Sequence, residues 1–566
     1  MKLKSLLYAA VIGVMSLSSC SDFLDKIPDN RVDPQTPEQL LLMLVDGYSY
    51  ANYAKYCEYS SDNIVDNTSP DRNGMRYNLQ GMGKLEDEMF AWEDAKSDDG
   101  QDSPSMIWEG AYHAIAVANH VLEKIDLWKK QGRQFEGNDK AMLQAAYGEA
   151  LMVRAYNHFM LVNIFAQHYR SDELSANDPG IPYVTKPEKQ VVVQYNRQSV
   201  AEVYKLIEQD LEEGLPYVSD LFYERPKYHF NKRASYAFAT RFYLFKRDYE
   251  KVEKYASLIL GSTPEQMMRT YWGKNYVSLD ASVQAYIDSQ SPSNLMLMTT
   301  YSMYWRAMIM GNRYTVNREP AFGTIFGTGP TWNTFNFHPC YLGKLYVCGG
   351  QEYGLWFPKV YELFEYSDKV AGIGFVHIVR TEFTTEEVIL SRAEARIFMG
   401  DLEGAVADMR VWDNSRQKLP ASFKFSTLTS DIIKSFYDKA AWGDKYREND
   451  PRPEVFKTLN IDEITPSDKY SVTPEIEPYL YCVLHFRRIE NLFDGGRWFD
   501  VKRFGIEYEH KIGRDRVEFL SKLDPRRALQ IPSEVISAGI EPNNRMNVVS
   551  RFTNPSGYMK YTGSIK

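Results

Sequence analysis

The sequence predicts an all-α protein, in which tetratricopeptide-like helical hairpins form a scaffold for a long loop-rich half that binds the ligand. Three stretches support this fold class. Residues 144–165 have the apolar spacing of one helix, and residues 234–260 and 386–412 each have the pattern of two helices separated by a short break. Gly148 is the single helix breaker in the first stretch.

The two predicted hairpins align with each other. Asp248-Tyr249-Glu250 in one matches Asp401-Leu402-Glu403 in the other. Aspartate suits both positions because its carboxylate can cap the free amides at the start of the second helix. Small residues such as Ala237 and Ala393 allow paired helices to approach closely. This pattern is typical of the 34-residue helical hairpin repeat and predicts a partial helical solenoid.

Three irregular stretches interrupt the helical pattern, at residues 261–293, 311–366 and 442–478. The middle one is dense in glycine, proline and aromatic residues. Loops of this length in a folded chain are usually either functional or disordered, and the many Trp, Tyr and Phe residues argue against disorder. We therefore expect ordered surface loops, where binding sites are commonly found.

The N-terminus has the features of a lipoprotein signal. Lys2 and Lys4 precede an apolar run over residues 6–17, which is too short to span a bilayer, and Ser18-Ser19-Cys20 follows. Residues 1–19 are predicted to be removed, which leaves a lipid-modified Cys20 that tethers the chain to a membrane. The alternative is an ordinary signal that is cleaved elsewhere, with Cys20 incidental.

Charge and cysteine content exclude other classes of protein. The chain has 566 residues and a net charge of −9, so loss of residues 1–19 with their two lysines leaves 547 residues and −11. Such an acidic chain is a poor candidate for binding nucleic acid. Four further cysteines are too few for a disulfide framework. Cys340 and Cys348 could staple one loop, or both could be buried thiols.

A series of motifs along the mature chain resembles the SusD/RagB family of surface lipoproteins. The opening Cys20-Ser21-Asp22-Phe23-Leu24-Asp25-Lys26-Ile27-Pro28 is similar to the start of that family after its lipobox. The further matching segments, in chain order, are Tyr59–Asp62, Trp108–Asn119, Arg154–Asn163, Val388–Ala395, Arg488–Arg503 and Leu529–Glu534. Single segments are weak signals, but their number and order make the resemblance specific.

The resemblance implies two helical regions, residues 20–230 and 231–566, packed as one globular unit. It also implies a protein at the outer membrane, facing the cell surface, that binds an oligosaccharide and delivers it to a SusC-type TonB-dependent barrel. A peptide-capturing, RagB-like protein is the alternative. The family has no catalytic step and no cofactor. Its ligand-contact residues follow no common motif, so none can be transferred to this chain.

The late motif also has a physical interpretation. Glu490, Arg497, Asp500 and Arg503 place alternating charges at helical spacing, which suits ion pairs that fasten helices together. A carboxylate-binding or acid/base site is the alternative. The structural interpretation is favoured because Trp498 and Phe499 surround these charges with packing surface.

Enzyme motifs are absent from the sequence. It has no Gly-x-Ser-x-Gly elbow, no His-Glu-x-x-His helix and no Cys-x-x-Cys pair. The run from Asp98 to Asp102 resembles part of a calcium loop without its final glutamate, so we predict no metal site there. A helical glycan-cleaving enzyme and a scaffold without a small ligand remain as rivals from other functional classes.

Aromatic and polar residues outside the helical pattern are candidates for ligand contact. Aromatics make up 14% of the chain, with 40 tyrosines. Aromatic faces pack against sugar C–H groups, while neighbouring polar groups bind the hydroxyls. The predicted contact residues are Trp92, Arg72, Arg76, Tyr304, Trp305, Trp332, Asn333 and Trp356. The alternative for each ring is burial beneath a loop, and we assign Trp108 to the core.

Overall fold

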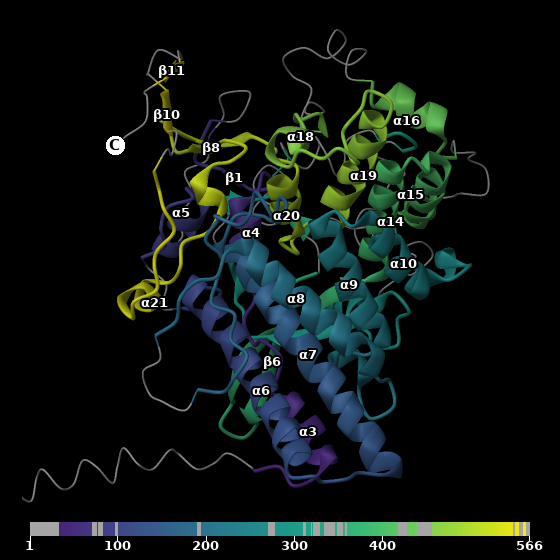
Figure 1. Ribbon diagram of the computed structural model, residues 1–566. Coiled ribbons are helices and arrows are strands. Elements are labelled where there is room, and N and C mark those ends of the chain that lie inside the picture. The colour runs from purple at the N-terminus through teal and green to yellow at the C-terminus, as the bar shows by residue number, and fades with distance from the viewer. Residues whose placement is uncertain are drawn as a thin grey trace, which may run out of the picture.

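The computed structural model describes residues 33–70, 76, 83–96, 100–188, 194–269, 278–308, 313–317, 320, 329–332, 346–347, 355–356, 359–416, 427–438, 455–546, 550–553 and 559–561. Most of the described chain is helical (Figure 1). Across these ranges, none of the helices combines the length and apolar character needed to cross a membrane.

Helices provide the scaffold. In the first half of the chain they are α3 (Pro37–Leu44), α4 (Ala54–Ser60), α5 (Lys84–Phe90), α6 (Pro104–Lys130), α7 (Gly137–Phe165), α8 (Val200–Gly214), η1 (Leu215–Tyr217), η2 (Pro226–Tyr228), α9 (Lys232–Lys246), α10 (Tyr249–Leu260), η3 (Pro264–Met267) and α11 (Leu279–Tyr286). In the second half they are α12 (Tyr304–Arg306), α14 (Thr385–Met399), α15 (Leu402–Arg416), α16 (Ser430–Phe436), α18 (Ile461–Ile464), α19 (Glu477–Glu490), α20 (Gly496–Arg503), η7 (Pro525–Arg527) and α21 (Ser533–Ser537).

Short antiparallel sheets complete the mostly helical fold, which confirms the predicted helical scaffold. The strands are β1 (Val65–Asp66), β2 (Asn294–Thr300), β3 (Tyr314–Thr315), β4 (Tyr346–Val347), β5 (Leu355–Trp356), β6 (Glu362–Asp368), β7 (Ile373–Thr384), β8 (Tyr508–Ile512), β9 (Arg516–Leu520), β10 (Ser550–Thr553) and β11 (Met559–Tyr561). They form sheets in the orders β1-β3, β2-β7-β6, β4-β5 and β11-β10-β9-β8.

Helix α7 is the predicted helix 144–165, extended at its N-terminus, and it lies between α6 and α8. Its C-terminal two-thirds are buried almost continuously. Gly148 explains the close approach to η1, which follows α8, because a Cβ there would lie 2.8 Å from the backbone carbon of Tyr217. The residue that weakens the helical pattern therefore permits the tight packing.

Both predicted hairpins are confirmed, as α9–α10 and α14–α15, and α10 packs against α14 so that the two hairpins stack. Asp248 caps α10 by accepting a hydrogen bond from the amide of Lys251 at 3.2 Å. Asp401 accepts from the amide of Gly404 at 3.0 Å. The capping role that the sequence alignment assigns to both aspartates is thus present.

The charges of the late motif are buried and paired across helices. Asp500 of α20 accepts from Arg487 of α19 at 3.0 Å and from Arg503 at 2.8 Å. Arg503 also pairs with Glu394 of α14 at 2.7 Å. Arg497 binds Asp62, which follows α4, at 2.8 Å. The structural interpretation of this motif is confirmed, because its ions fasten α4, α14, α19 and α20 together.

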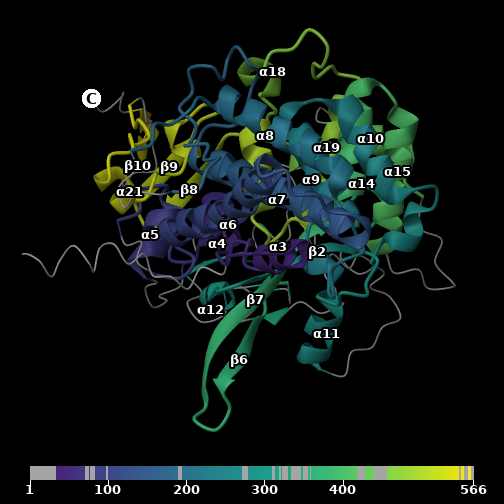
Figure 2. The ribbon, with the colours of Figure 1, turned by 60° about the horizontal axis from the view of Figure 1, so that its bottom comes forward.

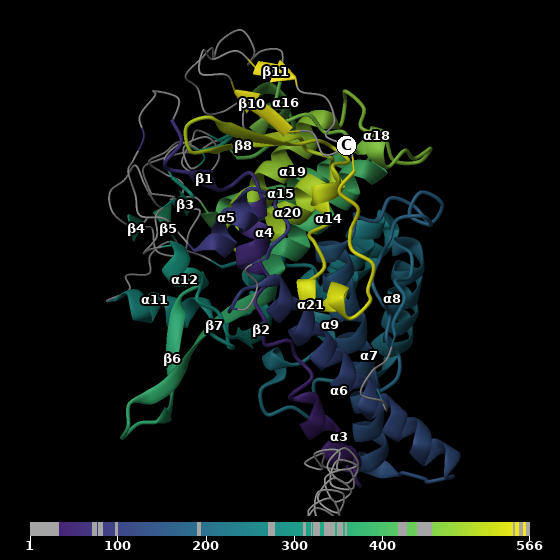
Figure 3. The same ribbon diagram turned by 90° about the vertical axis from the view of Figure 1, so that its left-hand side faces the viewer.

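The three-stranded sheet β2-β7-β6 lies against the helical body, and its outer part leaves that body as a hairpin. Figure 2 shows β6 and the facing part of β7 projecting beyond the other elements, with α11 and α12 near the hairpin's base. Figure 3 shows α6 to α9 on one side of the molecule and β3 to β5, α11 and α12 on the other. Helical scaffold and loop-rich part therefore occupy opposite sides.

Candidate functional site

Trp92, a predicted contact residue, lies in the interior. Its side chain is 3% exposed and its indole N–H donates to the carbonyl of Ser60 at 2.8 Å. The ring stacks on His510 with centroids 4.1 Å apart. Because these contacts use both the ring face and the indole N–H, the placement favours the alternative of burial over contact with a ligand.

Trp92 belongs to a stack of rings with an arginine at each end. The order is Arg526, Trp92, His510, Phe90, Tyr314 and Arg313, with successive ring centroids 4.1 to 4.5 Å apart and the two guanidinium carbons 5.4 and 4.7 Å from their rings. Stacked rings and cation–π contacts each add to the stability gained from burial. The stack joins α5, β3 and β8, so it is an element of the core.

Tyr304 and Trp332 are also internal. Tyr304 is fully buried, and burial raises the pKa of its phenol. Trp332 is 3% exposed, and its ring lies 5.6 Å from those of His485 and Phe486 of α19. As for Trp92, burial is the interpretation that these placements favour.

The other predicted residues are placed as follows. Arg76 is exposed, Trp305 is half-buried, and Trp356 lies on β5. Cys20, Arg72, Asn333, Cys340 and Cys348 lie outside the described residues, as do Asp98 and Asp99 of the acidic run. Asp102 is described and buried, and its carboxylate accepts a hydrogen bond from the amide of Met303 at 3.0 Å. It thereby fixes the turn that leads to Trp305.

Partly exposed rings lie near the base of the projecting hairpin in two groups, one around Tyr301 and one at Trp305. We call Tyr50, Tyr301, Phe375, Trp305 and Tyr361 the aromatic face. The Tyr301 ring lies 5.3 Å from that of Phe375 and 6.1 Å from that of Tyr50, and the Trp305 ring lies 5.1 Å from that of Tyr361. Tyr301 and Phe375 are 38% and 37% exposed, which leaves ring surface open to a ligand.

Backbone pairing brings these rings together from distant segments. The amide of Tyr301 donates to the carbonyl of Tyr50 at 2.8 Å, just beyond the end of β2. Thr299 faces Val379 across β2 and β7, and Glu365 faces Phe375 across β7 and β6. Because side chains alternate along a strand, Tyr301 and Phe375 then project from the same side of the sheet.

Polar groups surround the aromatic face. The Tyr361 hydroxyl donates to Asp280 at 3.1 Å, Arg306 pairs with Glu362 at 2.6 Å, and Nε2 of His113 lies 3.0 Å from Asp46. Burial and, secondly, Asp280 raise the pKa of Tyr361. The phenol therefore stays protonated near neutral pH. The face offers ring surfaces, hydroxyls and charged hydrogen-bonding groups.

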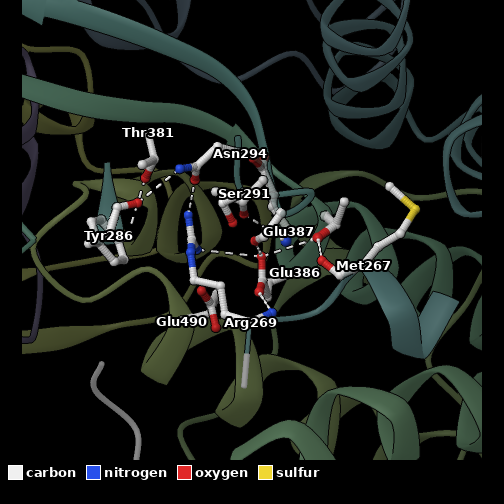
Figure 4. A network of polar contacts seen from close by, with 12 residues as sticks. Met267, Arg269, Tyr286, Ser291, Asn294, Thr381, Glu386, Glu387 and Glu490 are labelled. Carbon is white, nitrogen blue, oxygen red and sulfur yellow. Dashed lines mark hydrogen bonds and ion pairs between the residues drawn. The ribbon is translucent and has the colours of Figure 1, made fainter. Parts of the chain in front are cut away.

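A buried polar network fastens the sheet to neighbouring helices (Figure 4). The Tyr286 hydroxyl lies 3.2 Å from Oγ1 of Thr381 on β7, and the Asn294 amide donates to the carbonyl of Tyr286 at 2.9 Å. The Arg269 guanidinium donates to the side chain of Asn294, and the backbone amide of Arg269 donates to the Glu386 carboxylate at 2.7 Å. The network joins β2, β7, α11 and α14.

The carboxylates in and beside this network are paired with arginines, which bears on the glycosidase alternative. Arg416 binds Glu490 at 2.5 Å and lies 3.8 Å from Glu386. Burial alone would raise the pKa of Glu490, but Arg416 and Lys359 hold it below its usual range. A glycosidase needs one carboxylic acid that stays protonated as a proton donor, so Glu490 cannot serve in that role.

Glu58 is the buried carboxyl whose properties come nearest to those of a general acid. Burial raises its pKa to about 7. Its oxygens accept from the Asn63 amide at 3.0 Å and from the backbone amides of Phe493 and Gly495 at 3.2 and 3.1 Å. It is fully buried between α4 and α20, where a substrate could not reach it. We therefore assign Glu58 to the packing of the core.

This assignment predicts a pH effect. Between pH 4.5 and 7 the folded state binds more protons at Glu58 than the unfolded state, so the stability contributed by Glu58 falls as the pH rises through this window. Between pH 4.5 and 7, the free energy of unfolding of the wild type should fall by about 3 kcal/mol relative to that of Glu58→Gln. Urea unfolding of both proteins at pH 4.5, 6 and 7.5 measures the difference. If the free energies of unfolding of the two proteins changed equally with pH, Glu58 would not titrate in this range.

Comparisons with known proteins agree with this architecture. Residues 22–244 match the SusD-like family described as "Starch-binding associating with outer membrane". No curated protein sequence matches the chain. The family description is one of binding, in agreement with a non-enzymatic protein.

Solved structures resemble the chain over most of its length. A SusD superfamily protein from Bacteroides thetaiotaomicron VPI-5482 is 16% identical, with a TM-score of 0.55, covering 90% of this chain and 100% of that one. A putative sugar binding protein from Bacteroides vulgatus ATCC 8482 is 16% identical, with a TM-score of 0.57 and coverage of 90% and 97%. A SusD-like carbohydrate binding protein from the same organism is 14% identical, with a TM-score of 0.53 and coverage of 89% and 96%. Residues 22–244 thus match the SusD-like family model, and the fold resembles that of SusD superfamily structures over about nine-tenths of the chain.

Proposed function

We propose that this protein is a cell-surface lipoprotein that binds an oligosaccharide without cleaving it and delivers it to a SusC-type TonB-dependent barrel in the outer membrane. The observation that carries the binding step is the aromatic face, where rings from three distant segments remain partly exposed beside hydrogen-bonding groups. The description of the matched family and the names of two similar proteins, which refer to starch or sugar binding, support the choice of ligand.

The chemistry of the aromatic face suits a sugar. Tyr301 and Trp305 can pack against the C–H faces of successive rings, while Asp280, Arg306 and His113 lie near enough to the edge of the face to bind hydroxyls. The tyrosines supply contact area at a low cost in side-chain entropy. Arg76, Arg72, Asn333 and Trp356 remain proposed contacts that the geometry of this face does not use.

Affinity gels containing starch and other polysaccharides test the binding step. We expect the mature chain to be retarded and Tyr301→Ala with Trp305→Ala to weaken binding at least tenfold, which corresponds to about 1.4 kcal/mol. Tyr217→Ala is the matched control, because Tyr217 is 40% exposed on η1. If the double variant were retarded as strongly as the wild type, the aromatic face would not be the binding site for the polysaccharide. Reducing ends released over time would show an enzyme, and retention by peptide columns alone would favour peptide capture.

The membrane anchor is a separate part of the proposal, and it rests on the lipobox at Ser18-Ser19-Cys20. Metabolic labelling with palmitate should mark the wild-type chain and leave Cys20→Ser unlabelled. The Cys20→Ser protein should also leave the membrane fraction. If the wild-type chain carried no label, the lipid anchor at Cys20 would be rejected, while the proposed binding step would be unaffected.

A further inference from the structure

The projecting part of the β6–β7 hairpin exposes apolar side chains to an unusual degree. Among the described residues, seven of the fifteen exposed large apolar side chains lie between residues 301 and 375. Val370 at the tip is 99% exposed, and Ile373, Tyr366 and Phe364 are 61%, 53% and 48% exposed. Contiguous apolar surface of this kind usually marks a contact with another molecule.

These side chains occupy both faces of the hairpin. Phe364 faces Val376 and Tyr366 faces Gly374 on one face, whereas Glu365 faces Phe375 on the other. The Phe364 ring packs closely over Gly374, which is possible because Gly374 has no side chain: a Cβ there would lie 2.7 Å from that ring. The aromatic face uses only the side that bears Phe375. The rings of Phe364 and Tyr366 therefore need a different explanation.

Strand β6 is also the edge of its sheet. The strand order is β2-β7-β6, so along the described chain β6 pairs with β7 on one side and has no strand on its other side. An edge strand presents a row of backbone donors and acceptors that can pair with an extended segment from another molecule. Apolar rings and an open edge together suit strand addition.

Charge argues against two possible occupants of the edge. In a twofold antiparallel pairing of two copies, Glu365 at the centre of β6 would face its own copy, and like charges opposite each other destabilise a sheet. Insertion into lipid would place Glu365, Asp368 and the unpaired backbone of β6 in hydrocarbon, at a cost of several kcal/mol for each unsatisfied group. A protein segment with basic residues meets neither objection.

The hairpin points toward the same end of the molecule as the first described helix. In Figures 1 and 3 its tip and α3 both lie toward the lower end. A groove of about 920 Å³ between α3 and α6 lies at that end too, with exposed Leu42 and Leu127 beside Asp46 and Glu123. The groove also carries Lys124 and Lys130, which pair with Asp33 and Asp126, and it adjoins the start of the described chain at Asp33, thirteen residues after Cys20.

We propose that strand β6 docks an extended, basic segment of a protein partner by strand addition, with Phe364 and Tyr366 packing against that segment. This inference rests on the proposed function for the identity of the partner, which is the outer-membrane barrel that receives the cargo. Glu365 in the middle of β6 supplies the charge complementarity, whereas Asp368 lies beside Lys369 and accepts from the amides of Val370 and Ala371, so the complex should weaken as the salt concentration rises.

Purification of the lipoprotein–barrel complex from native outer membranes tests the proposal. The double variant Phe364→Ser with Tyr366→Ser removes both exposed rings from an exposed strand, so it should fold normally. We expect at least a tenfold loss of barrel, identified by mass spectrometry, and unchanged retardation on the affinity gel. Tyr217→Ser with Leu221→Ser is the matched control, since these side chains are exposed elsewhere, and it should retain the barrel.

The outcomes separate the two proposals. Equal recovery of the barrel with wild type and the hairpin variant would overturn the docking role of β6 and leave delivery intact. Loss of both barrel and polysaccharide binding in the variant would assign the hairpin to the glycan site instead, which also overturns the inference. A wild-type preparation without any barrel would contradict the delivery step and the docking assignment together, while binding on the gel would stand.

Discussion

Replacement of Asp62 by alanine is expected to lower the free energy of unfolding by about 3–5 kcal/mol, the range for breaking a buried ion pair. The carboxylate binds Arg497 at 2.8 Å and Lys457 at 2.8 Å, and it lies 3.7 Å from Arg488. Burial alone would raise the pKa of Asp62, but the three cations hold it well below its usual range. Its removal leaves the two buried arginines without that counter-charge.

Urea or thermal unfolding at pH 7 measures this loss. Asp126→Ala is the matched control, because Asp126 pairs with Lys130 on the surface of α6, where both side chains are more than 60% exposed. Such a pair contributes at most about 0.5 kcal/mol. If Asp62→Ala were as mild as Asp126→Ala, the ion cluster between α4, α19 and α20 would not hold the helices together.

Trp92→Ala should also be strongly destabilising, by about 3–5 kcal/mol, the range for truncation of a large buried aromatic side chain. The variant removes the ring between Arg526 and His510 and the hydrogen bond to the carbonyl of Ser60. Trp92→Phe should lose less, because a six-membered ring remains in the stack, although the five-membered ring and its N–H are lost. Chemical unfolding of both variants provides the measurement.

The same variants decide between the two interpretations of Trp92. If the ring belongs to the core, polysaccharide retardation by the folded fraction of Trp92→Ala should match wild type. If stability is unchanged and retardation is lost, Trp92 contacts the ligand after all, and its placement in the interior would be contradicted.

Much of the scaffold could be predicted from the sequence because its signals are local. The capping aspartates Asp248 and Asp401 lie within three residues of the amides they bind, and the helical period of α7 is visible in a single stretch. The charges of the late motif could likewise be interpreted as structural, since Trp498 and Phe499 lie within the same helix.

The sheet escaped prediction for a physical reason. Strand β2 is buried at six of its seven positions and therefore shows the apolar run Asn294-Leu-Met-Leu-Met-Thr-Thr300 rather than an alternating pattern. Such a run cannot be distinguished from a buried helical segment by period alone. Strands β6 and β7 do pair locally, but the tip between them, residues 369–372, has no Asn-Gly or Asp-Gly turn signal.

The candidate site could be predicted only in part, because burial depends on distant partners. The Tyr301–Trp305 segment was accessible to sequence reasoning as an aromatic patch outside the helical pattern. Tyr50 and Phe375, which complete the face, come from segments 251 and 74 residues away from Tyr301, and no local pattern links them. Trp92 gave the same signal as Trp305, yet His510, which covers it, lies 418 residues further along the chain.

A crystal structure of the mature chain with an oligosaccharide from the polysaccharide that retards it tests the central claim most directly. We expect an intact sugar chain with its rings against Tyr301 and Trp305. Electron density for the sugar at a site remote from these two rings, or for a cleaved product, would contradict it.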